Sequence, residues 1–153
     1  MKKYLILFII IQVLFAFPAN ALEIGKWTFV AEDNYCYIGS APTKEEGKYD
    51  KRGDTYTLVY RINKGPEKIV QITAGYNYDE KKPIIVIIDQ TKFKFFGDGD
   101  TAWTRDKDKE VIYAMKKGNK MIVQGTSTRG TLTTDTYTLK GFTAASNQLS
   151  SDC

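Results

Sequence analysis

The chain has 153 residues, of which 22 are Lys or Arg and 18 are Asp or Glu, so its formal net charge is +4. Histidine is absent, which removes the commonest general base and the usual zinc ligand and excludes hydrolases that depend on a histidine. Basic and acidic residues are interspersed, which is typical of solvated loops and not of a nucleic-acid-binding stripe. We therefore expect no nucleic-acid partner.

The first 21 residues have the pattern of a secretory signal peptide. Lys2 and Lys3 precede an apolar run over residues 4–17, and Pro18 then leads into the small residues of Ala19-Asn20-Ala21. The run is shorter than the roughly 20 apolar residues that a transmembrane helix needs, although an uncleaved anchor is the alternative. We expect cleavage after Ala21 and a mature protein that is periplasmic or secreted, with no stable membrane anchor.

Residues 22–153 are enough for one domain and too few for two. They contain the only two cysteines, Cys36 and Cys153. Because an exported chain enters an oxidising space, we predict a disulfide between them, which would also hold the C-terminal residues in place. The alternative is a thiol left free for a partner or a lipid, although a bacterial lipoprotein needs its cysteine directly after the cleavage site and Cys36 lies well beyond it.

Most of this region carries strand signals, since Tyr, Thr, Ile, Val and Phe dominate and Gly, Asn, Asp and Pro recur at short intervals. The polar segment 41–53 is predicted as a long solvated loop, and the turn Asn63-Lys64-Gly65-Pro66 predicts a hairpin. The β-branched run 84–88 is predicted at the centre of a sheet with both faces covered. In the run 92–95, Lys-Phe-Lys-Phe, the phenylalanines are expected to point inward. Strands are predicted at residues 26–31, 35–39, 55–62, 67–74, 84–88, 92–95, 120–128 and 134–140.

Two short helices interrupt this pattern. The first is predicted at residues 108–117, with Asp108 as its cap, an apolar face and Gly118 as a left-handed stop. The second is predicted at residues 142–150. The fold class is therefore mostly β: a single antiparallel β-sandwich or barrel-like domain with one or two short helices.

Four carboxylates, Asp98, Asp100, Asp106 and Asp108, lie close together in the sequence and are the best candidates for a metal site. Their spacing lacks the ligand pattern of a calcium loop, so we interpret them as solvated turn residues and expect no metal and no cofactor. The chain also has ten tyrosines and two tryptophans. These aromatic residues either line a carbohydrate or peptide groove or form cross-strand pairs in the core, and the core is the commoner outcome.

The last third of the chain carries three recognisable segments: Gly97-Asp98-Gly99-Asp100-Thr101-Ala102-Trp103, Ala114-Met115-Lys116-Lys117-Gly118 and Gly125-Thr126-Ser127-Thr128-Arg129-Gly130-Thr131. Together with the segment 134–145 and Cys153, they resemble the invasion-associated locus B family of exported bacterial proteins. The resemblance extends over about residues 25–153. It is dense after Gly97 and thin before Ile88.

The resemblance implies one β-rich domain of the periplasm or cell envelope with no established enzymatic activity. Founding members of the family are linked to bacterial entry into red blood cells, a role that we do not transfer to this chain. The resemblance assigns no catalytic residues, so we expect none in this chain. The motif residues Trp103, Arg129, Asp135 and Phe142 are predicted to determine the fold.

Arg129 and Asp135 are further predicted to form an ion pair across a hairpin whose loop is residues 130–134. The function expected is that of a non-catalytic envelope protein that binds a protein or another envelope component. The alternative is a small glycan-binding module or a carboxylate-based hydrolase. The hydrolase needs two carboxylates in a cleft, flanked here by Trp27 or Trp103.

Overall fold

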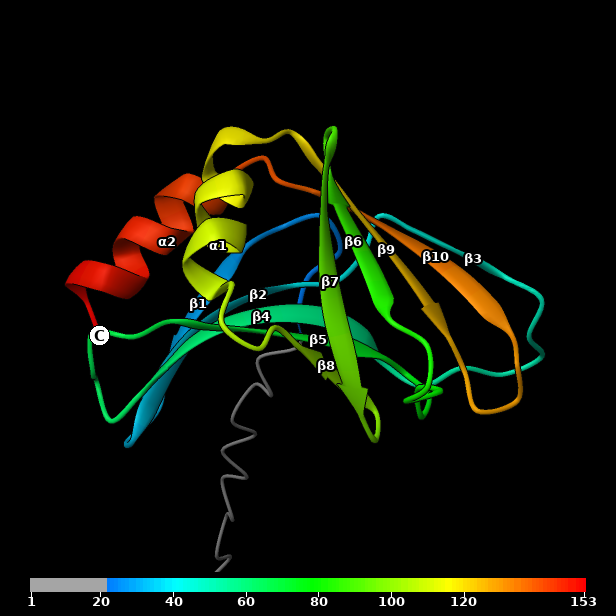
Figure 1. Ribbon diagram of the computed structural model, residues 1–153. Helices are drawn as coiled ribbons and strands as arrows, with labels where there is room; N and C mark the ends of the chain where they lie inside the picture. The colour runs from blue at the N-terminus through cyan, green and yellow to red at the C-terminus, as the bar shows by residue number, and fades with distance from the viewer. Residues whose placement is uncertain (1–21) are drawn as a thin grey trace, which may run out of the picture.

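Ten strands form one antiparallel sheet that curls into a half-barrel in the computed structural model, which describes residues 22–153 (Figure 1). The order across the sheet is β1-β2-β4-β5-β8-β7-β6-β9-β10-β3. The predicted mostly β, barrel-like fold is confirmed, whereas the predicted signal peptide lies outside the described residues. The strands are β1 (Thr28–Ala31), β2 (Tyr35–Ser40), β3 (Lys44–Gly47), β4 (Thr55–Ile62), β5 (Ile69–Ala74), β6 (Ile84–Ile88), β7 (Thr91–Asp98), β8 (Thr101–Trp103), β9 (Lys120–Thr126) and β10 (Leu132–Thr138).

The hairpin predicted at the turn 63–66 is confirmed, and the strands predicted at residues 26–31 and 35–39 form another. Strand β1 pairs with β2 and β4 pairs with β5, both in antiparallel register. The turn between β4 and β5 places Asn63 and Lys64 at φ of 51° and 54°, in the left-handed region that asparagine tolerates better than most residues. Strand β5 begins at Ile69, two residues later than predicted.

Strand β3 corrects the prediction that residues 41–53 are an unstructured loop. Its four residues, Lys-Glu-Glu-Gly, are all exposed and pair with β10 at one edge of the sheet. A short, charged strand at an edge protects the sheet against pairing with other chains. Such a strand has no apolar alternation, so its sequence resembles a loop.

Strand β6 lies between β7 and β9, as its apolar sequence predicted. The prediction that both of its faces are covered was wrong for one face, because Ile84, Val86 and Ile88 are buried while Ile85 and Ile87 are only half-buried. One face of the sheet packs against the core and the other is open to solvent. The side chains of β6 on the open face are therefore only half-buried. Strand β8, only three residues long, was not predicted.

The helices α1 (Asp108–Lys117) and α2 (Phe142–Ser151) lie within a residue of their predicted limits. Two details were wrong. Asp108 makes no cap; its carboxylate accepts hydrogen bonds from the Val70 amide at 2.7 Å and the Thr104 hydroxyl at 2.8 Å, which attaches the helix to β5. Gly118 has an extended backbone, and a Cβ there would lie 2.7 Å from Ile88 Cγ2, so close packing requires this glycine.

The two helices pack against each other and against the filled face of the sheet (Figure 1). Their buried side chains, including Val111, Met115 and Leu149, join one core with the inward residues of the strands. Phe142 meets Trp27 edge to face with ring centroids 4.8 Å apart, and Trp27 Nε1 donates to the Thr138 carbonyl at 2.9 Å. Within residues 22–153, no helix has the length and apolar composition needed to cross a membrane.

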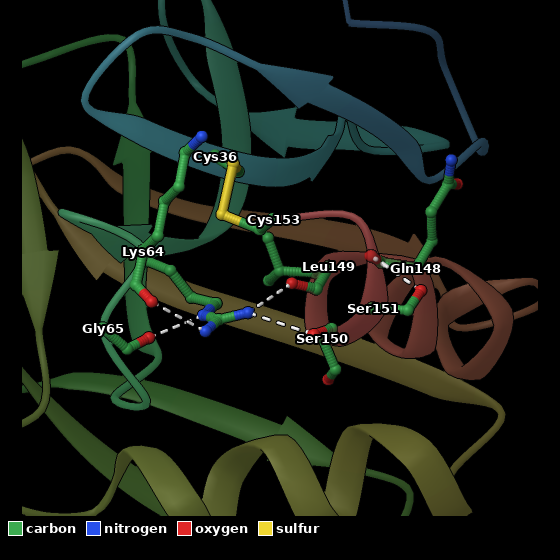
Figure 2. Close-up of a disulfide and its surroundings, with 9 residues drawn as sticks. Cys36, Lys64, Gly65, Gln148, Leu149, Ser150, Ser151 and Cys153 are labelled. Carbon is green, nitrogen blue, oxygen red and sulfur yellow. Dashed lines mark hydrogen bonds between the residues drawn. A yellow bond between two sulfur atoms is a disulfide. The ribbon is translucent and has the colours of Figure 1, made fainter.

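The predicted disulfide between Cys36 and Cys153 is confirmed, and it joins β2 to the residues after α2 (Figure 2). Next to it, the Arg61 guanidinium donates to the carbonyls of Leu149 and Ser150 at 3.0 and 3.2 Å. It also donates to the carbonyls of Lys64 and Gly65. Because α2 has no basic residue in its last turn, this arginine of β4 supplies the cation that a helix C-terminus favours.

Tyr78 and Tyr137 are fully buried in the core, and neither phenol oxygen has a hydrogen-bond partner among the described residues. Burial raises the pKa of both phenols well above the ordinary value. A phenol with a raised pKa in the folded state keeps its proton at a pH where the unfolded chain has lost it. The stabilisation is therefore fully present below the pKa of the unfolded chain and is lost as the pH rises.

We expect Tyr78 and Tyr137 each to lower the free energy of unfolding by roughly 1 kcal/mol between about pH 10 and pH 11. Urea unfolding across this pH range measures the fall. Tyr137→Phe should reduce the total fall by about 1 kcal/mol, whereas the exposed Tyr113→Phe should leave it unchanged. A free energy that stays flat across the range would contradict the assignment.

Candidate functional site

An open groove crosses β2, β4 and β5 on the face of the sheet that points away from the helices. Its volume is about 560 Å³. We call it the tyrosine groove, because four of its nine lining residues are tyrosines. Those nine are Leu22, Asn34, Tyr35, Tyr37, Tyr56, Leu58, Tyr60, Ile62 and Gln71.

The groove arises from the two-residue period of β4. Thr55, Thr57 and Val59 point to the core and are buried, so Tyr56, Leu58, Tyr60 and Ile62 point outward. The register places Tyr37 of β2 opposite Tyr60. Gly39 leaves room for the aliphatic part of the surface, since a Cβ there would lie 2.6 Å from Leu58 and 2.7 Å from Leu22.

Three of the four tyrosines of the groove take part in aromatic pairs. Tyr35 stacks on Tyr37 with ring centroids 6.1 Å apart, and Tyr60 meets Trp103 edge to face at 6.1 Å. Burial, followed by the charge of Glu32, raises the pKa of Tyr37; burial, followed by the charge of Asp108, raises that of Tyr60. Both phenols therefore stay neutral near pH 7 and present hydroxyl groups that donate and accept hydrogen bonds.

None of the nine lining residues is charged, although 26% of the whole chain is. Tyr35 and Ile62 are 44% and 51% exposed, so the apolar part of this surface is open to a ligand. Two groups of aromatic residues are thus separated by the sheet. Those of β2 and β4 form a groove, whereas Trp27, Phe95, Phe142, Tyr78 and Tyr137 fill the core as predicted.

The structure does not bring the four candidate carboxylates together. Asp98 ends β7, Asp100 follows in the turn before β8, Asp106 is exposed in a loop, and Asp108 is committed to Val70 and Thr104. Among residues 22–153, no cluster of three or more acidic or cysteine side chains is placed to hold a metal ion.

Asp135 forms an ion pair with Arg52, and the predicted pair with Arg129 was wrong. The Arg52 guanidinium donates two hydrogen bonds to the Asp135 carboxylate, at 2.7 and 2.5 Å, and its Nε donates to the Ala74 carbonyl. Both side chains are almost fully buried, at 4% and 1% exposed. Burial lowers the pKa of Arg52, but the hydrogen bonds and charge of Asp135 outweigh that effect and raise the pKa above its ordinary value.

The hairpin register explains the error. The loop is residues 127–131, and it includes Gly130 at φ +83°. It is closed by the Ser127 amide, which donates to the Thr131 carbonyl, and by the Thr131 amide, which donates to the Ser127 hydroxyl. Asp135 therefore lies opposite Val123 and points into the core, while Arg129 is exposed in the loop. Nothing in the polar segment 41–53 distinguished Arg52 from its solvated neighbours, so sequence reasoning missed it.

The other two predicted fold determinants lie in different environments. Phe142 is fully buried against Trp27. Trp103 is half-buried on the outer face beside Tyr60, where its indole N–H donates to the Thr101 hydroxyl at 3.1 Å. Trp103 therefore extends the aromatic surface of the tyrosine groove.

Fold and groove together define a class of protein: a small half-barrel closed by two helices and a disulfide, with an uncharged aromatic surface on its open face. The family described as invasion associated locus B (IalB) protein matches residues 28–150. The chain therefore belongs to the invasion associated locus B family, which confirms the resemblance seen in its motifs.

A solved structure described as invasion associated protein B from Bartonella henselae has a similar fold, with a TM-score of 0.58. The similarity covers 82% of this chain and 92% of that chain, at 17% sequence identity. At this identity, the likeness concerns the fold alone. A comparison with curated proteins finds no match.

Proposed function

We propose that this chain is an exported, non-catalytic protein of the bacterial envelope that binds a partner protein through the tyrosine groove. Family membership and a disulfide suited to an oxidising compartment support the location. The observation that carries the binding role is an open groove of about 560 Å³ with four tyrosines and no charged residue among its lining.

The composition of the groove resembles the centre of a protein–protein interface. Such centres are enriched in aromatic residues and depleted in charged ones. The aliphatic side chains of Leu22, Leu58 and Ile62 lie among the tyrosines and suit apolar side chains of a partner. The tyrosines add contact area at low cost in side-chain entropy.

A neutral glycan is the second candidate ligand of the same groove. Asn34 and Gln71 carry amide groups beside the tyrosine hydroxyls, and together these groups suit the hydroxyls of a sugar. Hydrolysis of that glycan is not part of the proposal. A glycosidase uses a pair of carboxylates at the scissile bond, and the groove has none among its lining residues.

Photo-crosslinking in the native bacterium tests the partner. A benzoylphenylalanine replaces Tyr56 in the groove or, as a matched control, Tyr113, which is 66% exposed on α1. We expect position 56 to give one discrete adduct that protease treatment destroys, and position 113 not to give it. The groove variant Tyr37→Ser/Tyr60→Ser, with its folding checked by urea unfolding, should lose the adduct.

Three outcomes would overturn the proposal of a protein partner. These are the absence of an adduct at position 56, the same adduct from both positions, and an adduct that survives the double substitution in the groove. A protease-resistant adduct that glycan-degrading enzymes remove would replace the protein partner with the neutral glycan.

A further inference from the structure

A second pocket lies at the opposite end of the sheet from the helices and shares no residue with the tyrosine groove. It is enclosed by the loop between β3 and β4, the segment that follows β5 and the hairpin between β9 and β10. Its volume is about 530 Å³, which is within the usual range for a small-molecule site. We call it the basic pocket.

Three cations at this pocket have no side-chain partner among the residues that the structure describes. Lys48, Lys51 and Arg129 are exposed, and none makes a hydrogen bond or an ion pair through its side chain within residues 22–153. Asp50 is the one carboxylate among the lining residues. The mouth of the pocket therefore carries more positive than negative charge.

Arg52 also lines the pocket, but its charge is already balanced. Asp135 holds the guanidinium, and Glu45 lies 3.8 Å away. The guanidinium lies over the rings of Tyr49 and Tyr76, 5.3 Å from each centroid, which adds cation–π attraction. Arg52 is therefore held in place as part of the pocket wall. Lys48, Lys51 and Arg129 remain available to bind a ligand.

Neutral polar groups complete the lining. Asn77, Ser127, Thr128 and Thr131 contribute an amide and three hydroxyls. Amides and hydroxyls of this kind match the hydroxyls of a sugar, whereas lysine and arginine match phosphate or carboxylate oxygens. A ligand that combines both features fits the pocket better than either a neutral sugar or a bare anion.

We propose that the basic pocket binds an acidic sugar, that is, a monosaccharide or disaccharide unit carrying a phosphate or a carboxylate. Lys48, Lys51 and Arg129 hold the anionic group, and the amide and hydroxyl groups hold the sugar. Such units occur both as free metabolites and as parts of polymers, and they share this chemistry. The inference is independent of the tyrosine groove.

Titration of the isotope-labelled mature protein, followed by NMR, tests the proposal with five probes. Glucose 6-phosphate and glucuronic acid should shift the backbone amides of Gly75, Asn77 and Thr128, and glucose should not. Inorganic phosphate should bind more weakly than glucose 6-phosphate. Oligomers of glucuronic acid that bind more tightly than the monomer identify a polymer as the source, and equal affinity identifies the free sugar.

Lys51→Gln/Arg129→Gln should weaken binding of the acidic sugars by at least about tenfold, because each removed cation loses a charge-assisted hydrogen bond. The matched control is Lys92→Gln/Lys94→Gln, two exposed lysines of β7, which should bind as the wild type does. Equal shifts with glucose, equal affinity for inorganic phosphate and glucose 6-phosphate, no shift with any probe, or undiminished binding by the pocket variant would each overturn the proposal.

Discussion

Asp135→Ala is expected to destabilise the protein by about 3–5 kcal/mol, the usual cost of removing one partner of a buried ion pair. The reason is that the Arg52 guanidinium, 4% exposed, would lose two hydrogen bonds and its buried counter-charge, which leaves only Glu45, 39% exposed and 3.8 Å away. Arg52→Ala should cost a similar amount, because the Asp135 carboxylate is then the unpaired group. Urea unfolding at neutral pH measures both losses.

The double variant distinguishes this pair from two independent sites. Arg52→Ala/Asp135→Ala should lose clearly less than the sum of the single variants, since no charge is left unpaired. Arg129→Ala is the matched control and should change stability by no more than about 0.5 kcal/mol, as an exposed residue without a partner does. Additive losses, or a large effect of Arg129→Ala, would show that the pair does not act as a buried unit.

Cys36→Ser/Cys153→Ser should lower the free energy of unfolding by about 4–5 kcal/mol, because the disulfide closes a long loop in the unfolded chain. The two cysteines are 117 residues apart in sequence. Urea unfolding of the variant, compared with the oxidised and the reduced wild type, measures the loss. The reduced wild type should behave like the variant.

The disulfide and the hydrogen bonds of Arg61 both hold α2 in place, and substitution of Arg61 separates their contributions. In the serine variant its guanidinium still binds the carbonyls of Leu149 and Ser150, so α2 should stay helical below the unfolding midpoint. Adding Arg61→Ala to the serine variant should release the helix and lower the midpoint further. A reduced wild type as stable as the oxidised protein would contradict the predicted loss.

Elements with strong local signals were predictable from the sequence. In the sequence of α1, the apolar face and the residues that mark its two ends lie close together. The sequence of the β4–β5 hairpin combines alternating apolar residues with a turn of suitable residues. Strand β3 was not predictable, because its pairing with β10 is a property of the folded sheet and its four residues are exposed. Edge strands often lack the pattern on which sequence reasoning depends.

The tyrosine groove shows a second limit of sequence reasoning. Both faces of β4 are compatible with a core, since one carries Thr57 and Val59 and the other carries Tyr56 and Tyr60. Alternation shows that these two sets lie on opposite faces but does not show which set is inside. The smaller side chains are inside because the helices and the disulfide pack against that face. The sequence is compatible with either a groove or a core for these aromatic residues, and only the tertiary structure assigns the groove to particular residues.

The position of α2 also bears on how the protein folds during its synthesis. Strands β1 and β2 are made early, but α2, which packs against them, begins only at Phe142. Cys36 likewise has no partner thiol until Cys153 has been made. The first half of the chain therefore cannot complete its core alone, and contacts so distant in sequence favour slow folding of the whole domain. Oxidation can therefore stabilise the native fold once the chain is complete. It cannot form a disulfide within an incomplete chain, because the second cysteine is the last residue.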